Sequence, residues 1–372
     1  GYFPWVDYKW GYEVGVPVKN SAISDVFSAA YPWKSLAISY IKQGSIPLWN
    51  PFVFAGSPLL ANWQAGVFYP LNILMIIFEN IYGWTLMIIL QPLFASVFMY
   101  FFLRKIRLSL LPALFGAIVF AFSGYFMIFL EYNYLQAGIW LPLLLYFVES
   151  YIWERKIRYL VFTTLIVFVI LSAGNFQISL FSLMLAATYL ICRLFFSSIG
   201  NRIKILINLG LFCLLGIGLI SIQLIPTFEL FLRSIRGMDS NIVQQNFGLL
   251  PLKNLITFLA PDFFGNPATR NFTGFLYHET SAYFGIIPLV FVFLAIKQRN
   301  NFFSKFFAII FLIVLALVLD TFVGKSIYLF KIPLISTSYA SRALFILTFC
   351  AAVLAAQGLE LFSLNKRLLT RA

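Results

Sequence analysis

The residues best suited to chemistry are a few ionisable side chains in a chain that has few of them. Asp25 stands at the expected start of an amphipathic helix, just ahead of a segment rich in proline and aromatic residues. A carboxylate in that place could act as a general base toward a hydroxyl group. It could equally be a solvated charge or a helix-end cap. The residue types alone leave both roles open.

His278 and Glu279 directly precede an apolar helix. The pair could bind a metal ion or polarise a phosphate group, but the chain has only 1 histidine and neither an HxxxH nor a CxxC motif. The sequence therefore predicts no metal site and no cofactor, and a role for a divalent metal ion stays open. Glu279 could face a ligand, or it could stabilise the N-terminus of the helix.

Arg342 lies in the stretch STSYASRALFIL, at the expected outer start of the last helix. A charge there is costly without a partner, and the planar guanidinium suits a phosphate or a carboxylate. Because Lys325 and Lys331 lie in the same connection, we expect Arg342 to contact the anionic headgroup of a lipid. The alternative is an arginine that reaches to the membrane surface without a ligand.

The segment 47–72, PLWNPFVFAGSPLLANWQAGVFYPLN, contains four prolines, which rule out one continuous helix. Its broken backbone must lie at a membrane surface or line a wet cavity, because lipid satisfies no backbone amide. Aromatic rings can stack on sugar faces while amides bond to sugar hydroxyls, although aromatic residues are also common at membrane interfaces. The candidate substrate contacts of this segment are Trp49, Asn50, Asn62, Gln64 and Tyr69.

The elements that hold these residues are membrane-spanning helices. Of the 372 residues 61% are hydrophobic and 10% are charged, which is typical of a polytopic, all-α membrane protein. Apolar windows predict about nine spans, at 84–103, 111–130, 134–153, 158–173, 175–196, 205–230, 281–297, 304–320 and 341–362. We also expect Gly116, Gly210, Gly216 and Gly218 to permit close approach of helices.

The net charge of +13 has an uneven distribution along the chain. Basic residues gather in alternate connections between the expected spans, at 104–107, 155–158, 193–204, 297–305 and 366–371. The positive-inside rule makes that side cytoplasmic, which excludes a nucleic-acid partner as the reason for the charge. The sequence thus predicts a multi-pass protein of the cell membrane, with residues 1–83 extracytoplasmic and the C-terminal end cytoplasmic.

Four regions follow from this topology. Residues 1–83 form a first outer loop with amphipathic helices, 84–230 form spans, 231–280 form a large outer loop, and 281–372 form further spans and the cytoplasmic end. In the first loop apolar residues recur from Val26 to Ile41 at helical spacing, interrupted at Pro32. We expect Lys34 and Lys42 to lie on the other faces of this interfacial helix pair.

Several collinear stretches resemble the bacterial YfhO-like membrane proteins, which are similar to glycosyltransferases of the GT-C fold. The block from WNP to FYP in 47–72 is the most specific part of the resemblance. The matching stretches are Asp25 with Tyr31 and Pro32, the 47–70 block, Trp140 to Pro142, Phe263 to Gly265, Glu279 with Tyr283 to Gly285, and Arg342 with Gly358 and Leu359.

The resemblance implies a GT-C-like helix bundle that transfers a sugar from a polyprenyl-phosphate donor to a cell-envelope glycan or glycolipid. Asp25 takes the role of general base in an inverting transfer, while Glu279 and Arg342 face the donor phosphate or the acceptor. It also implies a first transmembrane helix ahead of residue 1 and further parts after residue 372. A transporter or flippase of a lipid-linked saccharide, without bond chemistry, is the alternative.

Overall fold

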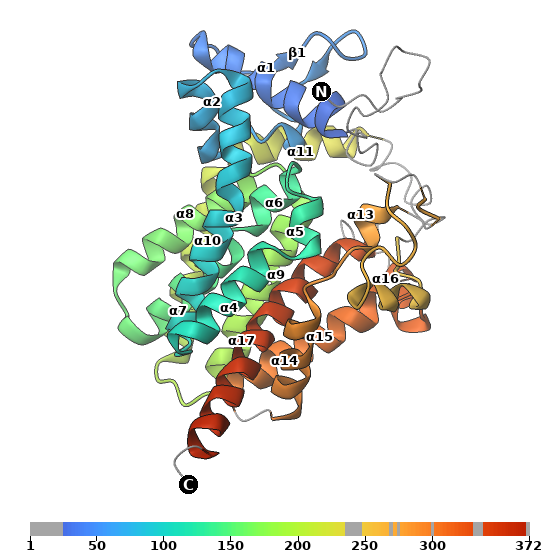
Figure 1. Cartoon of the computed structure of the whole chain (residues 1–372). Coiled ribbons are helices and arrows are strands. Elements are labelled where there is room, and N and C mark those ends of the chain that lie inside the picture. The colour runs from blue at the N-terminus through green and yellow to red at the C-terminus, as the bar shows by residue number, and fades with distance from the viewer. Residues whose placement is uncertain are drawn as a thin grey trace.

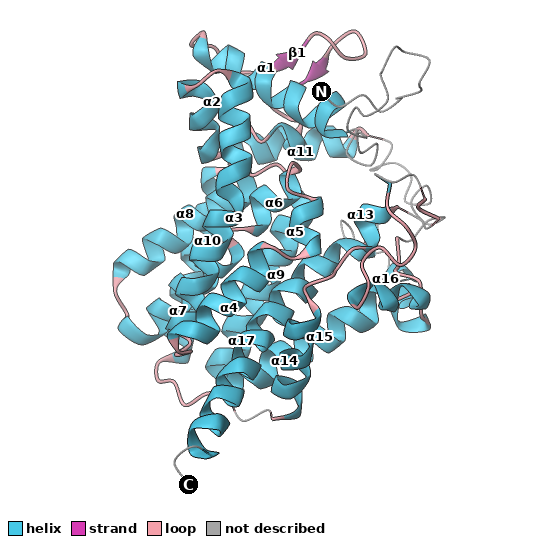
Figure 2. Ribbon diagram, viewed as in Figure 1, coloured by secondary structure: helices cyan, strands magenta, loops and turns pink. Residues whose placement is uncertain are grey.

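The computed structural model describes residues 25–234, 248–267, 271–273, 276–298, 301–329 and 338–369. The first 24 residues of the expected outer loop and residues 235–247 of the large loop lie outside this range, as do Lys331 and Arg371. The described part is almost entirely helical, as Figure 2 shows, and the expected all-α class is confirmed.

The helices follow one another from the blue end to the red end of Figure 1. They are α1 (Tyr31–Lys42), α2 (Ile73–Ile77), α3 (Asn80–Lys105), α4 (Leu110–Ala121), α5 (Gly124–Ile128), α6 (Asn133–Gly138), α7 (Leu141–Glu154), α8 (Ile157–Ser172), α9 (Phe176–Phe195), α10 (Arg202–Leu219), α11 (Ser221–Leu232), α13 (Tyr277–Thr280), α14 (Ile286–Lys297), α15 (Phe302–Val318), α16 (Phe322–Leu329) and α17 (Leu344–Leu369). The strands β1 (Trp49–Asn50) and β2 (Ser57–Pro58) form a small antiparallel hairpin.

The centre of the bundle is α17, drawn in red in Figure 1. Every residue from Leu344 to Ala356 is buried, and the helix packs against α4, α14 and α15. A run of alanines lets neighbouring helices come close, because small side chains are what membrane helices use at tight contacts. At Gly358 an added Cβ would lie only 2.0 Å from the carbonyl oxygen of Phe291, so α14 touches the backbone of α17 there.

The expectation of about nine spans is not confirmed for the described residues. Six helical segments are long and apolar enough to cross a membrane, or seven if the bent pair α14 and α15 counts as one span. The expected span 205–230 breaks at Ile220 into α10 and the short α11, and α14 meets α15 at 115°. The 16 residues of α8 cover about 24 Å, less than the roughly 30 Å of a bilayer core.

Several basic connections meet at one end of the bundle, the lower end in Figure 1. Lys105 forms an ion pair with Glu154 at 3.0 Å, and Arg155 donates a hydrogen bond to the carbonyl of Gly200 at 3.1 Å. The guanidinium of Arg193 lies 5.2 Å from the ring of Phe302. This clustering agrees with the charge pattern of the sequence, while the cytoplasmic assignment of that end stays a prediction.

The four glycines expected at helix contacts divide into two pairs. Gly116 faces Ala352 and Ala356 of α17, and Gly216 faces the carbonyl of Thr164 on α8, where an added Cβ would lie 2.8 Å away. A Cβ added at Gly210 or Gly218 would have no atom of another element within 4 Å, so the expectation is wrong for these two. A helical wheel alone does not tell a packed glycine from a lipid-facing one.

We therefore expect Gly216→Leu to destabilise the protein and Gly210→Leu, on the same helix, to leave it unchanged. The leucine at 216 must push α8 and α10 apart, and overpacking of this kind costs about 1–3 kcal/mol. The thermal unfolding midpoints of the two purified variants measure the difference. Equal midpoints would show that α8 and α10 are not in the close contact described.

The helix that carries the candidate base begins with a π-helical turn at Val26–Ala30 and continues directly into α1. Pro32 lies at the start of α1, directly after the π-helical turn, and the helix runs on through it, so the expected interruption at Pro32 is wrong. The buried stripe contains Ala30, Lys34 and Ala37. The expectation that Lys34 lies on an outer face is thus wrong: it follows Ala30 by four residues and shares its face.

Candidate functional site

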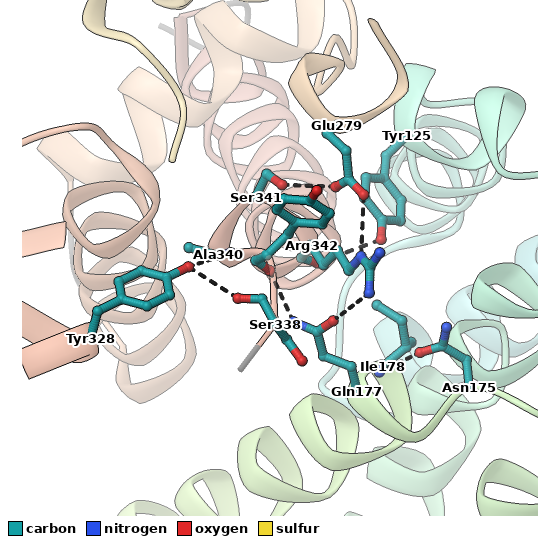
Figure 3. A network of polar contacts seen from close by, with 11 residues as sticks. Tyr125, Asn175, Gln177, Ile178, Glu279, Tyr328, Ser338, Ala340, Ser341 and Arg342 are labelled. Atoms are coloured by element: carbon teal, nitrogen blue, oxygen red, sulfur yellow. Dashed lines mark hydrogen bonds and ion pairs between the residues drawn. The ribbon is translucent and has the colours of Figure 1, made fainter. Parts of the chain in front are cut away.

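An ion pair between Arg342 and Glu279 is the centre of the polar network in Figure 3. Arg342 lies in the 3₁₀ turn Ala340–Ala343 that leads into α17, and Glu279 lies in α13. The Nε of Arg342 is 3.2 Å from Oε1 of Glu279, and Ser341 donates to Oε2 at 2.7 Å. The Glu279 side chain is only 4% exposed, so both of its oxygens are held in a largely dry environment.

The guanidinium of Arg342 has further partners that orient it. Its Nη1 donates to Oε1 of Gln177 at 3.0 Å, and Nε2 of Gln177 donates to the carbonyl of Tyr339 at 2.9 Å. The rings of Tyr134 and Tyr339 lie 4.9 and 5.2 Å from the guanidinium carbon. Among the described residues, Nη2 of Arg342 donates to no protein group, so N–H donors remain for a ligand.

His278 lies beside this network and packs edge-on against Phe129. Burial lowers the pKa of His278 from its usual value, an effect that the charge of Arg342 reinforces and that Glu279 and Asp25 oppose. The imidazole is therefore neutral at physiological pH. Its Nδ1 is buried and has no partner among the described residues, so it is available to a ligand.

Asp25 lies at the wall of a separate cavity of about 230 Å³. Its carboxylate is exposed, makes no capping hydrogen bond, and has no hydrogen-bond or ion-pair partner within the described part of the chain. The cavity is lined by residues of four regions: Asp25, Ala29, Ala30 and Trp33 of the first helix, Gln64, Tyr132, Asn133 and Tyr134 at the start of α6, and Gly174 and Asn175 just ahead of α9.

Tyr134 joins this cavity to the arginine network. Tyr134 is among the residues that line the cavity of Asp25, and the guanidinium of Arg342 lies over its ring. The neighbouring Tyr132 is close enough to both acids that Asp25 and Glu279, after burial, raise the pKa of its hydroxyl. Tyr134 and Tyr132 thus link the surroundings of Asp25 to the ion pair of Arg342 with Glu279.

Some residues of the 47–72 segment lie at the cavity of Asp25, and others belong to the hairpin of β1 and β2. Gln64 lines the cavity of Asp25, and its carbonyl accepts a hydrogen bond from Asn133. Asn62 caps the 3₁₀ turn Trp63–Ala65 by accepting from the amide of Gln64 at 3.2 Å. Contact of these two residues with a substrate stays a prediction.

Trp49, Asn50 and Tyr69 are not among the residues that line the cavity. The half-exposed Trp49 lies over Gly56 in the hairpin, and the buried Asn50 accepts a hydrogen bond from the amide of Phe52 at 2.9 Å. Tyr69 is buried, and its hydroxyl accepts from Trp140 at 3.1 Å. These contacts give the three residues structural roles, while their predicted contact with substrate remains untested.

Lys34 is the largest departure from expectation near the site. Its Nζ is fully buried and donates to Asn72 at 3.1 Å and to Gln136 at 2.9 Å. Asn72 in turn donates to the carbonyls of Gly66 and Val67. Lys34 therefore connects α1 to Asn72, which holds the turn that follows Gln64, and to α6. All three elements contribute residues to the walls of the Asp25 cavity or stand next to them.

Lys34 should give the protein a distinct dependence of stability on pH. Burial lowers the pKa of its amine to about 7, whereas the amine of an unfolded chain titrates near 10.5. Between these values the unfolded state binds the extra proton, so the free energy of unfolding rises with pH, by about 2 kcal/mol from pH 7 to pH 9. Thermal unfolding midpoints should show this rise in the wild type but not in Lys34→Met.

Lys42→Met is the matched control, because Lys42 is exposed on the same helix. It should keep the full rise between pH 7 and pH 9. If Lys34→Met rises as steeply as the wild type, the amine of Lys34 is not buried in the way described.

The sequence did not identify Gln177, Tyr134 and Lys34 as residues of the site. Gln177 and Tyr134 stand in apolar helices, and only the partners they meet across the fold distinguish them from ordinary helix residues. The four-residue spacing from Ala30 to Lys34 indicates that both lie on the same, buried face of the helix. The charge of Lys34 pointed to an exposed side chain instead. The signal was present for Lys34 and absent for the other two.

A comparison with protein families gives one result that bears on all of these residues. The model of the family described as bacterial membrane protein YfhO matches residues 59–371. The chain belongs to this family. Searches of curated proteins and of solved structures gave no match. The YfhO match contains Gln64, Glu279 and Arg342, whereas Asp25 and Trp49 precede it.

Proposed function

We propose that this YfhO-family membrane protein transfers a sugar from a polyprenyl-phosphate donor to a cell-envelope glycan or glycolipid on the extracytoplasmic side. The observation that carries the proposal is the placement of Asp25. Its carboxylate has no hydrogen-bond or ion-pair partner among the described residues, and it shares a cavity with Tyr134, whose ring centre lies 4.9 Å from the guanidinium carbon of Arg342. A base that lines the cavity and fixed guanidinium N–H donors next to Tyr134 suit a displacement at a phosphorylated sugar.

In this reaction the hydroxyl oxygen of the acceptor attacks the anomeric carbon of the sugar. The hydroxyl proton passes to the carboxylate of Asp25 as the new glycosidic bond forms. The bond from the anomeric carbon to the phosphate oxygen breaks, and polyprenyl phosphate leaves with the bonding electrons. A single displacement inverts the anomeric configuration, and it needs no cofactor because the donor is already activated.

The remaining groups serve the departing phosphate. The charge of Arg342 is balanced by Glu279, so its contribution is directed N–H donors rather than a net positive field. His278, whose Nδ1 has no partner among the described residues, adds a hydrogen bond to the same oxygens. In a water-poor site such fixed donors stabilise developing charge more strongly than they would in water.

A second candidate function, movement of the lipid-linked sugar across the membrane, is favoured by the broken helices. Short interruptions separate α4 from α5, α6 from α7 and α10 from α11, and α14 meets α15 at 115°. Interrupted helices are common in transporters, where they form binding sites and hinges. A flippase of this kind would bind the same lipid phosphate at Arg342 without using Asp25 as a base.

The anomeric configuration of the product tests the proposed reaction. The purified full chain is given polyprenyl-phosphate hexoses together with extracted cell-envelope glycan, and the linkage formed is read by nuclear magnetic resonance. We expect an anomer opposite to that of the donor. A product of retained configuration would rule out the single displacement with Asp25 as the base.

A further inference from the structure

An apolar groove begins beside the arginine network and runs along the bundle. Its volume is about 270 Å³, and its walls come from α9, α15, α16 and the turn that leads into α17. Met184 and Thr188 form one wall and Val314 the other, while the small Ala340 and Ala343 leave space between them. Most of the surface that faces the groove is apolar, and Gln177, Thr188 and Tyr328 are its polar lining residues, so the groove suits a hydrocarbon.

Gln177 connects this groove to the site. Its side chain lines the groove, and its Oε1 accepts the hydrogen bond from Nη1 of Arg342 at 3.0 Å. Ala343, on the opposite wall, follows Arg342 directly in the chain. The end of the groove at Gln177 and Ala343 therefore lies next to Arg342, whose Nη2 donates to no group among the described residues.

The other end of the groove opens toward the lipid. Met184 is 46% exposed, and Thr188, one turn further along α9, is exposed as well. Gln177 and Thr188 are about 16 Å apart along the axis of α9 at 1.5 Å per residue. Because α9 is one of the candidate spans, this path leads from the arginine into the depth of the bilayer.

We propose that the groove holds the hydrocarbon chain of a lipid phosphate whose phosphate group lies at Arg342. The proposal rests on the proposed function, of which this lipid is the donor or the released product. The arrangement matches such a molecule from end to end: guanidinium and amide at the head, carbon walls along the chain, and a lateral opening through which a long chain continues into the membrane. A polar or fully water-soluble ligand would leave the groove without a partner.

The test uses farnesyl monophosphate with a diazirine at the end of its chain, added to the purified full chain in lipid nanodiscs. Photolabelling followed by mass spectrometry should place the label on Met184, Thr188 or Val314. Thr188→Trp fills the groove and should lower the labelling by about tenfold, equivalent to 1.4 kcal/mol. Ala187→Trp, exposed on the same helix but outside the groove, should label like the wild type.

A second pair of measurements tests the head of the ligand. The corresponding diazirine-bearing farnesol lacks the phosphate and should label the groove weakly. In Arg342→Gln, labelling by the farnesyl monophosphate probe should fall to the same level. If excess phosphatidylglycerol removes the label completely, the groove is a general lipid crevice and the proposal is overturned. An even distribution of the label over all lipid-facing helices would also overturn the proposal.

The experiment also separates this inference from the proposed function. Transfer of sugar by wild type and Thr188→Trp alike, without label in the groove, would reject the groove and leave the transferase. Specific label in the groove without transfer from any donor would keep the lipid site and reject the transferase.

Discussion

Asp25→Asn is expected to lower the rate of sugar transfer by about 10²–10⁴-fold, the usual contribution of a general base. The amide has nearly the same shape as the carboxylate but does not accept the proton of the acceptor hydroxyl. Because Asp25 is exposed and makes no capping hydrogen bond, the variant should fold as the wild type does. Initial rates with a polyprenyl-phosphate sugar at saturating acceptor measure the effect.

Glu79→Gln is the matched control for this substitution. Glu79 is also an exposed acid at the start of a helix without a capping bond, and it does not line the cavity of Asp25. Its variant should transfer sugar at the rate of the wild type. Full activity of Asp25→Asn would remove Asp25 as the base, whatever the behaviour of the control.

Arg342→Met is expected to remove transfer and also to destabilise the protein by about 3–5 kcal/mol. The substitution leaves the carboxylate of Glu279 buried without its cation, and breaking a buried ion pair from one side has a cost of that size. It also removes the hydrogen bond to Gln177. Urea or thermal unfolding of the purified variant measures the first effect, and a transfer assay at low temperature measures the second.

The double variant Arg342→Met with Glu279→Met separates the two effects. Replacing both charges by apolar side chains should recover most of the lost stability, because no buried charge remains, but it should not restore transfer. Arg233→Met is the control for loss of an arginine, since its ion pair with Glu229 is exposed and should matter little. A double variant with restored transfer would show that Arg342 acts only on stability.

The sequence predicted the class of the fold because composition and apolar windows depend on the bilayer, not on tertiary contacts. It predicted more spans than the described helices confirm, since the break at Ile220 and the short α8 leave the average hydropathy of a window almost unchanged. Conversely, the glycine pattern did not show that Gly216 meets α8 while Gly210 meets nothing. Which face of a membrane helix is inside is set by its neighbours, because lipid and core are equally apolar.

The candidate site could be predicted where a residue was unusual for its surroundings. Arg342 and Glu279 stood out as charges next to apolar helices, and the structure brings the two together. Gln177 did not stand out, because an amide at a helix start is ordinary until its partner across the fold is known. For Lys34 the charge itself misled: the lysine is buried with two amide oxygens as its acceptors.

The most direct test of the central claim distinguishes transfer from transport in one experiment. The full chain is reconstituted in sealed liposomes with a radiolabelled polyprenyl-phosphate hexose and a soluble glycan acceptor on the side of Asp25. The account predicts that label moves from the lipid to the glycan, that free polyprenyl phosphate appears in equal amount, and that Asp25→Asn stops both. Labelled lipid that crosses the bilayer intact, at the same rate in wild type and Asp25→Asn, would contradict it.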